Sequence, residues 1–466
     1  MTKRTRSQAR FLAALVLAGV GAACSNNEPI AAPKRSLSPV AATSRDVTPI
    51  AGRHIFVMSA GVPADFAARV AEKGGTVVDN FAGAGTVITS GLSDDDAAAL
   101  SQGGVVANDV TARWAPTPSE LNAAVADLGN TAGGLIGSPL LAPALGVQWN
   151  MFQIHAPEAW GAGKLGNPAV KVAILDSGID PNHQELTGLV DLATSARVVS
   201  TPTQCLFSNS PAQWTDDFFH GTYVSGLVTT NSVVMAGVAP NVRLVAVKVL
   251  NSSGSGSFSD IICGLQYAVI IAHAKVINMS LGATFKGNTP GLVAFQQFFA
   301  QFVDFAKSQG AVVVSAAGND DKNLGNPHPF LELPCEAGSQ LCVSATSPRD
   351  KIAHYSNFGR AAIDVAAPGG EDKFLGKNPT GAEQLASLIL GPCARVFCGD
   401  ESHYLVADGT SAAAPHVSGL AALIFSNSTL SPDAVMTVIR QSADNIGNQS
   451  KFGDGRINVA RALGVQ

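Results

Sequence analysis

Residues 409–419 read Gly-Thr-Ser-Ala-Ala-Ala-Pro-His-Val-Ser-Gly. Ser411 stands among glycine, alanine and proline, so little besides its hydroxyl can project from this stretch. The small neighbours allow another backbone to approach closely, and the apolar positions that follow can continue as a buried helix. The pattern therefore predicts a nucleophile at the start of a helix. Because a serine hydroxyl is a weak nucleophile at neutral pH, the pattern also predicts a base and a group that orients the base.

Two earlier segments provide these groups. Residues 170–176 read Val-Lys-Val-Ala-Ile-Leu-Asp, which predicts a buried strand ending at Asp176. Residues 220–226 read His-Gly-Thr-Tyr-Val-Ser-Gly, which predicts a helix beginning near His220. The order acid, base, serine is one of the orders in which catalytic triads occur. Taken alone, each group also fits an ordinary role as a turn acid, a loop histidine or a close helix contact.

Three further blocks accompany these motifs. They are Gly-Ser-Gly-Ser-Phe at 254–258, Ile-Asn-Met-Ser-Leu-Gly at 277–282 and Ala-Ala-Gly-Asn at 316–319. Found together, the blocks resemble those of the subtilases, the subtilisin-type serine proteases, over roughly residues 147–464. The resemblance implies an α/β catalytic domain with a parallel sheet covered by helices on both faces. Strand patterns near 170, 244, 276 and 312 alternate with helical stretches, which independently favours such a sheet.

The resemblance also implies roles for individual residues. Ser411 would attack the scissile carbonyl, His220 would carry the proton, and Asp176 would hold the imidazole. Asn319 would donate its side-chain amide to the oxyanion, with the Ser411 backbone N–H as the second donor. An ordinary turn residue is the alternative for Asn319.

A polypeptide substrate would bind as an added strand between two protein edges. The expected substrate-binding residues are Ser255, Gly256, Phe258, Ser280, Leu281, Gly282, Ala317 and Gly318. Ser255 and Gly256 belong to the first edge, and Ser280, Leu281 and Gly282 to the second. The alternative for the first edge is a flexible glycine-serine loop. No cofactor is expected for the chemistry, although Asp364 resembles a position that binds structural calcium in some subtilases. A solvent-facing aspartate at a strand end is the other interpretation of Asp364.

Two other function classes fit the sequence less well. A catalytically silent binding protein on the same scaffold is disfavoured because Asp176, His220, Ser411 and Asn319 are all present. A non-proteolytic serine hydrolase is disfavoured because the Ser411 stretch lacks the Gly-x-Ser-x-Gly elbow and the triad order differs. The leading hypothesis is a serine endopeptidase made as an autoinhibited precursor.

Composition and the N-terminal sequence indicate which partners and which cellular location to expect. The 466 residues are 46% apolar and carry a net charge of −5, so nothing indicates a nucleic-acid partner. Residues 1–24 have a basic start, an apolar run and small residues before Cys24, which predicts a bacterial export signal. Lipidation at Cys24 and plain cleavage both stay open, because Gly21 replaces the leucine usual in lipoprotein signals. We expect a monomer, extracellular or in the cell envelope, that meets a membrane only through such an anchor.

Six cysteines follow the predicted signal. An even number in an exported chain favours disulfides, and six cysteines allow fifteen pairings. Short spacing favours Cys335–Cys342 and Cys393–Cys398 as local pairs, which leaves Cys205–Cys263 by elimination. A metal site at Cys393, Cys398 and His403 is the alternative for the third group.

The remaining segments are assigned by pattern. Residues 25–51 are predicted as a tether, and 52–113 as a small α+β domain with the ferredoxin-like order β-α-β-β-α-β. Its place before a subtilase-like unit implies an inhibitory propeptide that acts as a partner of its own enzyme; an accessory domain is the alternative. Residues 114–146 are predicted as a linker with the processing site, and 147–466 as the peptidase domain. The long connection 369–408 is expected to shape one wall of the cleft.

Overall fold

The computed structural model describes residues 47–58, 60–81, 85–101, 104–126, 138–201, 204–287, 292–324, 329–399 and 403–465. The export signal, Cys24 and most of the predicted tether lie outside these residues, as does 127–137 of the predicted linker. The first strand begins at Thr48, inside the predicted tether. Among the described residues, no helix has the length and apolar character that crossing a membrane would require.

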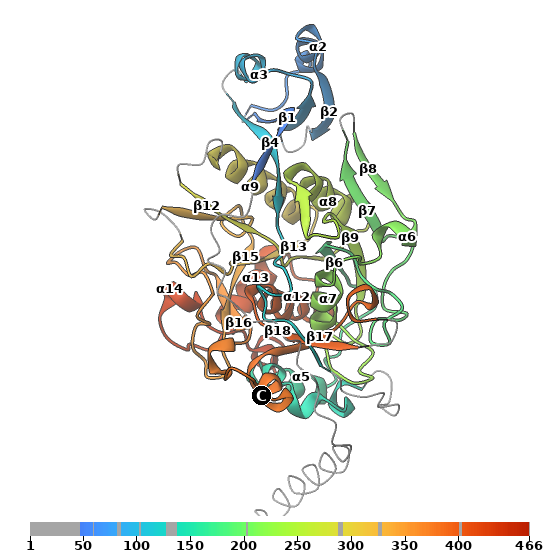
Figure 1. Ribbon diagram of the computed structural model, residues 1–466, viewed down its shortest axis with the longest axis vertical. Coiled ribbons are helices and arrows are strands. Elements are labelled where there is room, and N and C mark those ends of the chain that lie inside the picture. Colours follow the sequence, from blue (N-terminus) through green and yellow to red (C-terminus); the bar gives the residue numbers. More distant parts are fainter. Residues whose placement is uncertain are drawn as a thin grey trace, which may run out of the picture. The chain divides into compact units, whose positions relative to one another are not determined.

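An eight-stranded sheet forms the centre of the larger, C-terminal part of the chain (Figure 1). Its neighbouring strands are parallel except for the antiparallel pair β7–β8 at one edge. The predicted parallel sheet is therefore confirmed. In sheet order the strands are β16 (Val365–Pro368), β15 (Leu341–Thr346), β13 (Val312–Ala316), β11 (Val276–Met279), β6 (Lys171–Asp176), β9 (Arg243–Lys248), β7 (Ala196–Ser200) and β8 (Cys205–Ser208).

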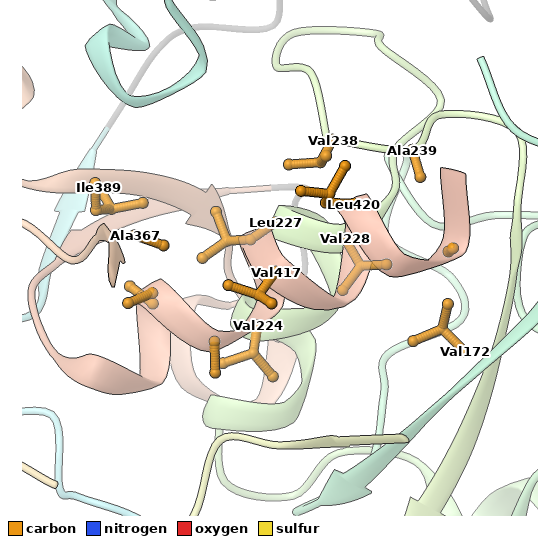
Figure 2. Close-up of a cluster of buried hydrophobic side chains, with 14 of the residues drawn as sticks. Val172, Val224, Leu227, Val228, Val238, Ala239, Ala367, Ile389, Val417 and Leu420 are labelled. Carbon is orange, nitrogen blue, oxygen red and sulfur yellow. The ribbon is translucent and has the colours of Figure 1, made fainter. Parts of the chain in front are cut away.

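Helices cover both faces of this sheet. Because side chains alternate along a strand, Val172 and Ile174 of β6 join one apolar cluster, while Ala173 and Leu175 join another. The first cluster contains α7 (His220–Val228) and α12 (Thr410–Asn427), and the second contains α8 (Phe258–Ile270) and α9 (Leu292–Ser308). Figure 2 shows α7 and α12 meeting through the labelled side chains of Val224, Leu227, Val228, Val417 and Leu420.

The N-terminal unit has the predicted order of elements. These are β1 (Thr48–Val57), α2 (Phe66–Glu72), β2 (Thr76–Phe81), β3 (Thr86–Ser90), α3 (Asp94–Leu100) and β4 (Val105–Arg113). The sheet order is β4-β1-β3-β2, and β10 (Ser255–Ser257) of the C-terminal part extends it beside β4. One sheet face packs on α2 and α3 through Phe56 and Val87. The other face, with Ile55, Ile88 and Val110, belongs to the cluster that contains α8 and α9.

Shorter elements complete the described structure. Two small sheets are β12–β14 and β17-β18-β5. The long connection 369–408 is largely regular, since it contains α10, β17, α11 and β18. The bounds are β5 (Ala124–Ala126), β12 (Ala283–Lys286), β14 (Phe330–Leu333), β17 (Ile389–Pro392), β18 (Tyr404–Ala407), α4 (Trp149–Gln153), α5 (Ala156–Gly161), α6 (Pro211–Trp214), α10 (Gly381–Ser387), α11 (Arg395–Cys398), α13 (Pro432–Gln441), α14 (Gln449–Phe452) and α15 (Val459–Ala462), with 3₁₀ turns at Pro139–Leu141, Leu145–Val147 and Asp372–Phe374.

Three disulfides join the pairs predicted from spacing and elimination: Cys205–Cys263, Cys335–Cys342 and Cys393–Cys398. The alternative of a metal site at Cys393 and Cys398 is therefore wrong, because both sulfurs are bonded to each other and neither is available as a thiolate.

Candidate active site

Asp176 and His220 meet at the carboxyl end of the parallel sheet. Asp176 is the last residue of β6, and His220 is the first residue of α7. His220 Nδ1 lies 2.8 Å from Asp176 Oδ2 and 3.0 Å from Oδ1, and both side chains are fully buried. Close approach of α7 is possible because Gly221 has no side chain: a Cβ there would lie 2.0 Å from the Gly178 carbonyl oxygen. This arrangement fixes the orientation of the imidazole.

A second buried acid, Asp216, holds the start of α7. One oxygen accepts hydrogen bonds from the backbone N–H and the hydroxyl of Thr222, at 2.9 and 2.6 Å. The other oxygen accepts from the Ser177 hydroxyl, which itself accepts from the Gly221 N–H. Burial raises the pKa of Asp216, an effect that the Thr222 hydrogen bonds oppose. Asp216 thus ties the turn after β6 to the helix that carries His220.

Ser411 lies in the first turn of α12 and is almost fully buried. Its hydroxyl donates to the Ser280 carbonyl oxygen at 3.1 Å, while the Ser280 hydroxyl donates to the Ser411 carbonyl oxygen at 2.9 Å. Among the described residues, no hydrogen-bond partner is found for the buried Nε2 of His220. The Asp176–His220 pair is therefore formed, whereas the Ser411 hydroxyl bonds to Ser280, in the second expected peptide-binding edge, and not to His220.

Hydrogen bonds to the side-chain oxygen of Asn319 orient its amide group. Its Oδ1 accepts hydrogen bonds from the backbone N–H and the hydroxyl of Thr410, at 2.9 and 2.8 Å. Its Nδ2 comes within 3.4 Å of the point that a Cβ on Gly409 would occupy, beside the loop that carries Ser411. The amide can therefore act as a donor toward this loop. The preceding Gly318 has φ +89, and a Cβ there would approach Asn357 and Glu332 to 2.7 Å or less.

The two expected peptide-binding edges are occupied by the chain itself. The Gly254 carbonyl oxygen accepts from the N–H groups of Trp114 and Ala115, at 3.0 and 3.1 Å, and the Gly282 N–H donates to the Trp114 carbonyl at 3.1 Å. Upstream, β4 pairs antiparallel with β10, with Gly256 opposite Ala112. The segment predicted as a linker thus begins with Trp114 hydrogen-bonded to both edges, directly after β4 ends at Arg113.

Trp114 fills an aromatic pocket beside these edges. The side chain is fully buried, and its indole N–H donates to the Gly256 carbonyl oxygen at 2.9 Å. The indole ring lies 6.2 Å from the ring of Phe258, 6.4 Å from Phe285 and 6.5 Å from Phe299, between ring centroids. Phe258 was expected to line a substrate pocket; Phe285 and Phe299 were not foreseen.

Comparison with known proteins decides the family. The sequence model of the subtilase family matches residues 167–456. The chain belongs to the subtilase family. Subtilisin NAT from Bacillus subtilis subsp. natto is 34% identical over 322 residues, covering 68% of this chain and 72% of the relative. Thermitase from Thermoactinomyces vulgaris is 33% identical over 324 residues, covering 68% of this chain and 95% of the relative.

Solved structures agree with this fold. The epidermin leader peptide processing serine protease from Staphylococcus aureus has a TM-score of 0.67 at 22% identity, over 88% of this chain and 97% of that one. A protease from Pseudoalteromonas arctica has a TM-score of 0.56 at 26% identity, over 70% of this chain and 99% of the other. As a subtilase, the protein is a serine-type endopeptidase that acts on polypeptides.

Subtilases commonly bind structural calcium, and the surroundings of Asp364 show whether an ion fits there. One carboxylate oxygen accepts from the Cys342 N–H at 3.0 Å, and the other lies 3.4 Å from Arg440 Nη1. Burial raises the pKa of Asp364, although the hydrogen bond from Cys342 and the charge of Arg440 oppose this rise. Because a guanidinium faces the carboxylate, these residues do not fit a calcium ion, and Asp364 acts here as an ion-pair partner.

Proposed function

We propose that the protein is an exported serine endopeptidase, made as an autoinhibited precursor, in which Ser411, His220 and Asp176 perform acyl transfer. The observation that carries the proposal is the buried Asp176–His220 pair, whose histidine begins α7, and α7 packs against α12, the helix that carries Ser411. A stretch of the same chain is hydrogen-bonded to both expected peptide-binding edges. The pair would provide the base and its orientation, and the stretch marks the path of a peptide.

In this mechanism His220 accepts the Ser411 proton as the hydroxyl oxygen attacks the scissile carbonyl carbon. Asp176 stabilises the imidazolium, and the Asn319 amide and the Ser411 N–H bind the oxyanion. The C–N bond then breaks, the leaving amine takes the proton from His220, and water hydrolyses the acyl-enzyme. The hydroxyl must first leave the Ser280 carbonyl and turn to His220 Nε2. Side chains and backbone N–H groups are sufficient for these steps, so no cofactor is needed.

The N-terminal unit, predicted at 52–113 and beginning in the structure with β1 at Thr48, acts as the inhibitory propeptide. Support comes from its apolar sheet face, which packs with α8 and α9, and from the pairing of β4 with β10. A strand added to an enzyme edge uses the backbone hydrogen bonds that a substrate would use. Trp114 fills an aromatic pocket, which indicates a preference for substrates whose residue in this pocket is large and apolar. Export rests on the signal pattern of residues 1–24, with Cys24 as the candidate for lipidation.

Comparison of the native chain with Ser411→Ala tests the proposal. Both precursors are purified, followed by intact mass, and treated with a serine-directed fluorophosphonate probe. We expect only the native chain to release the N-terminal unit and to react with the probe. Equal processing of both chains would assign the cutting to another protease, and an unreactive, unprocessed native chain would contradict the catalytic roles.

A further inference from the structure

The stretch that is hydrogen-bonded to the two expected edges does not continue as an extended strand. After Trp114, the chain folds into a hydrogen-bonded turn over residues 117–123. The N–H groups of Glu120 and Leu121 donate to the Thr117 carbonyl at 3.0 and 3.2 Å, and Ala123 N–H donates to the Pro118 carbonyl at 2.9 Å. The chain then extends again as β5, which pairs with β18. A peptide that is to be cut needs an extended backbone at this point.

Glu120 holds the turn together. Its Oε2 accepts from the N–H and the hydroxyl of Thr117, at 2.7 and 3.0 Å, and from Arg113 Nη1. Its Oε1 accepts from Arg113 Nη2 at 2.8 Å, which completes a bidentate pair. Burial alone would raise the pKa of Glu120, but the bonds from Arg113 and Thr117 outweigh it and lower the value to about 2. The carboxylate therefore stays charged throughout the working range of a serine peptidase.

The turn places Leu121 against the loop that carries the nucleophile. Leu121 is 1% exposed, and its Cδ2 lies 2.7 Å from the point that a Cβ on Gly409 would take. The Leu121 carbonyl accepts from the Asp408 N–H at 2.9 Å, and Asn122 Nδ2 donates to Asp408 Oδ1 at 3.1 Å. An apolar side chain thus packs beside the point that the Asn319 amide approaches, and the backbone on each side of the turn is anchored to the enzyme.

We propose that Arg113 and Glu120 form a clamp that folds residues 117–121 into a turn over Ser411, and that this segment is the processing site, whose cleavage the clamp delays. The inference rests on the proposed self-processing. When the turn opens, a carbonyl carbon of the segment reaches Ser411 Oγ and its C–N bond breaks. The new amine takes the proton relayed by His220, and one water releases the acyl group. A substrate that lacks this pair lies extended and is cut without delay.

The test compares native, Arg113→Gln and Glu120→Gln precursors during refolding by dilution at pH 7. Intact mass and N-terminal sequencing follow the conversion. Loss of a bidentate charged pair predicts about tenfold faster conversion in both variants, with the first cut within residues 117–121. The matched control is Lys73→Gln, which removes the exposed Lys73–Asp96 pair, 3.1 Å apart, from the same unit. This control should convert at the native rate.

A second measurement keeps the inference testable if a variant refolds poorly. In the Ser411→Ala background, an added unrelated protease should cut residues 117–121 in the clamp variants but not in the chain with the clamp intact. Native-rate conversion of the clamp variants, or a first cut elsewhere, overturns the clamp while self-processing stands. Absence of conversion in every chain with Ser411 intact contradicts the proposed function itself.

Discussion

Asn319 acts through a side chain whose oxygen and nitrogen face different partners. Thr410 donates twice to the oxygen, and this leaves the nitrogen toward the loop of Ser411. A donor held in place before the reaction stabilises the oxyanion without having to reorganise, which is the reason such donors contribute strongly to kcat. If Asn319 binds the oxyanion as proposed, Thr410 is its positioning residue.

We expect Asn319→Ala to lower kcat by roughly 100- to 1,000-fold and to change KM little, since the lost interaction forms only in the transition state. This magnitude is the one known for the oxyanion-hole asparagine of subtilisin, a member of the same family. Steady-state kinetics on a peptide anilide would measure both constants. Thr410→Val should lose part of the same activity, and Thr410→Ser should retain it. A rise in KM alone for Asn319→Ala would argue against the role.

At the scale of elements, small residues and cross-links determine how closely helices approach the site. A Cβ on Gly226 of α7 would come within 2.2 Å of Pro392, and one on Gly419 of α12 within 2.6 Å of Val238. The Cys205–Cys263 disulfide joins β8 to α8, which carries Phe258, and spans 58 residues of sequence. The Cys393–Cys398 disulfide spans only 5 residues.

Removal of each disulfide should therefore have different costs. Because a cross-link restricts the unfolded chain more when it closes a longer loop, Cys205→Ala with Cys263→Ala should lower the free energy of unfolding by about 4 kcal/mol. The matched double variant at Cys393 and Cys398 should lose about 2 kcal/mol by the same relation. Guanidinium unfolding of both variants in the Ser411→Ala background would measure the losses without self-digestion. Equal losses would contradict the loop-length explanation.

For the whole molecule, a buried charge lies where the N-terminal unit meets the catalytic part. Asp109 of β4 accepts from the N–H and the hydroxyl of Ser259 at 3.2 and 2.6 Å, and it lies 3.0 Å from Arg53 Nε. Burial raises the pKa of Asp109 to about 6, although Arg53 and Ser259 oppose the rise, while Asp260 adds to it. The acid is thus easier to protonate in the docked state than in an unfolded chain.

This shift predicts a pH dependence of stability. A pKa raised in the folded state gives a contribution that is full below about pH 4 and is lost as the pH rises through about 6. Relative to Asp109→Asn, the Ser411→Ala precursor should therefore lose on the order of 1–3 kcal/mol of stability between pH 4 and pH 7. Denaturant unfolding at several pH values would measure the difference. If the free energies of unfolding of the two proteins changed in parallel between pH 4 and pH 7, Asp109 would not cause the predicted pH dependence.

Much of the fold and site was predictable because its signals are local. Each signal occupies one short stretch of sequence: the strand that ends at Asp176, the helix that begins at His220, and the small residues around Ser411. The order of the three motifs along the chain is the order that subtilases have. Asp216 was missed because its partners, Ser177 and Thr222, are common hydroxyl residues whose approach depends on the packing of α7.

By itself the sequence determined the triad candidates, the parallel sheet and the α+β order of the N-terminal unit, since periodicity, motif and spacing are read along the chain. It favoured the three cysteine pairs without deciding them. Only the tertiary structure decided what the supposed linker does. Arg113 and Glu120 look like ordinary solvent-facing charges in the sequence, and Trp114 like an isolated aromatic residue. Their roles depend on contacts with residues far along the chain, among them the pairing of β4 with β10 and the bonds of the segment to Gly282 and Asp408, which periodicity and spacing do not show.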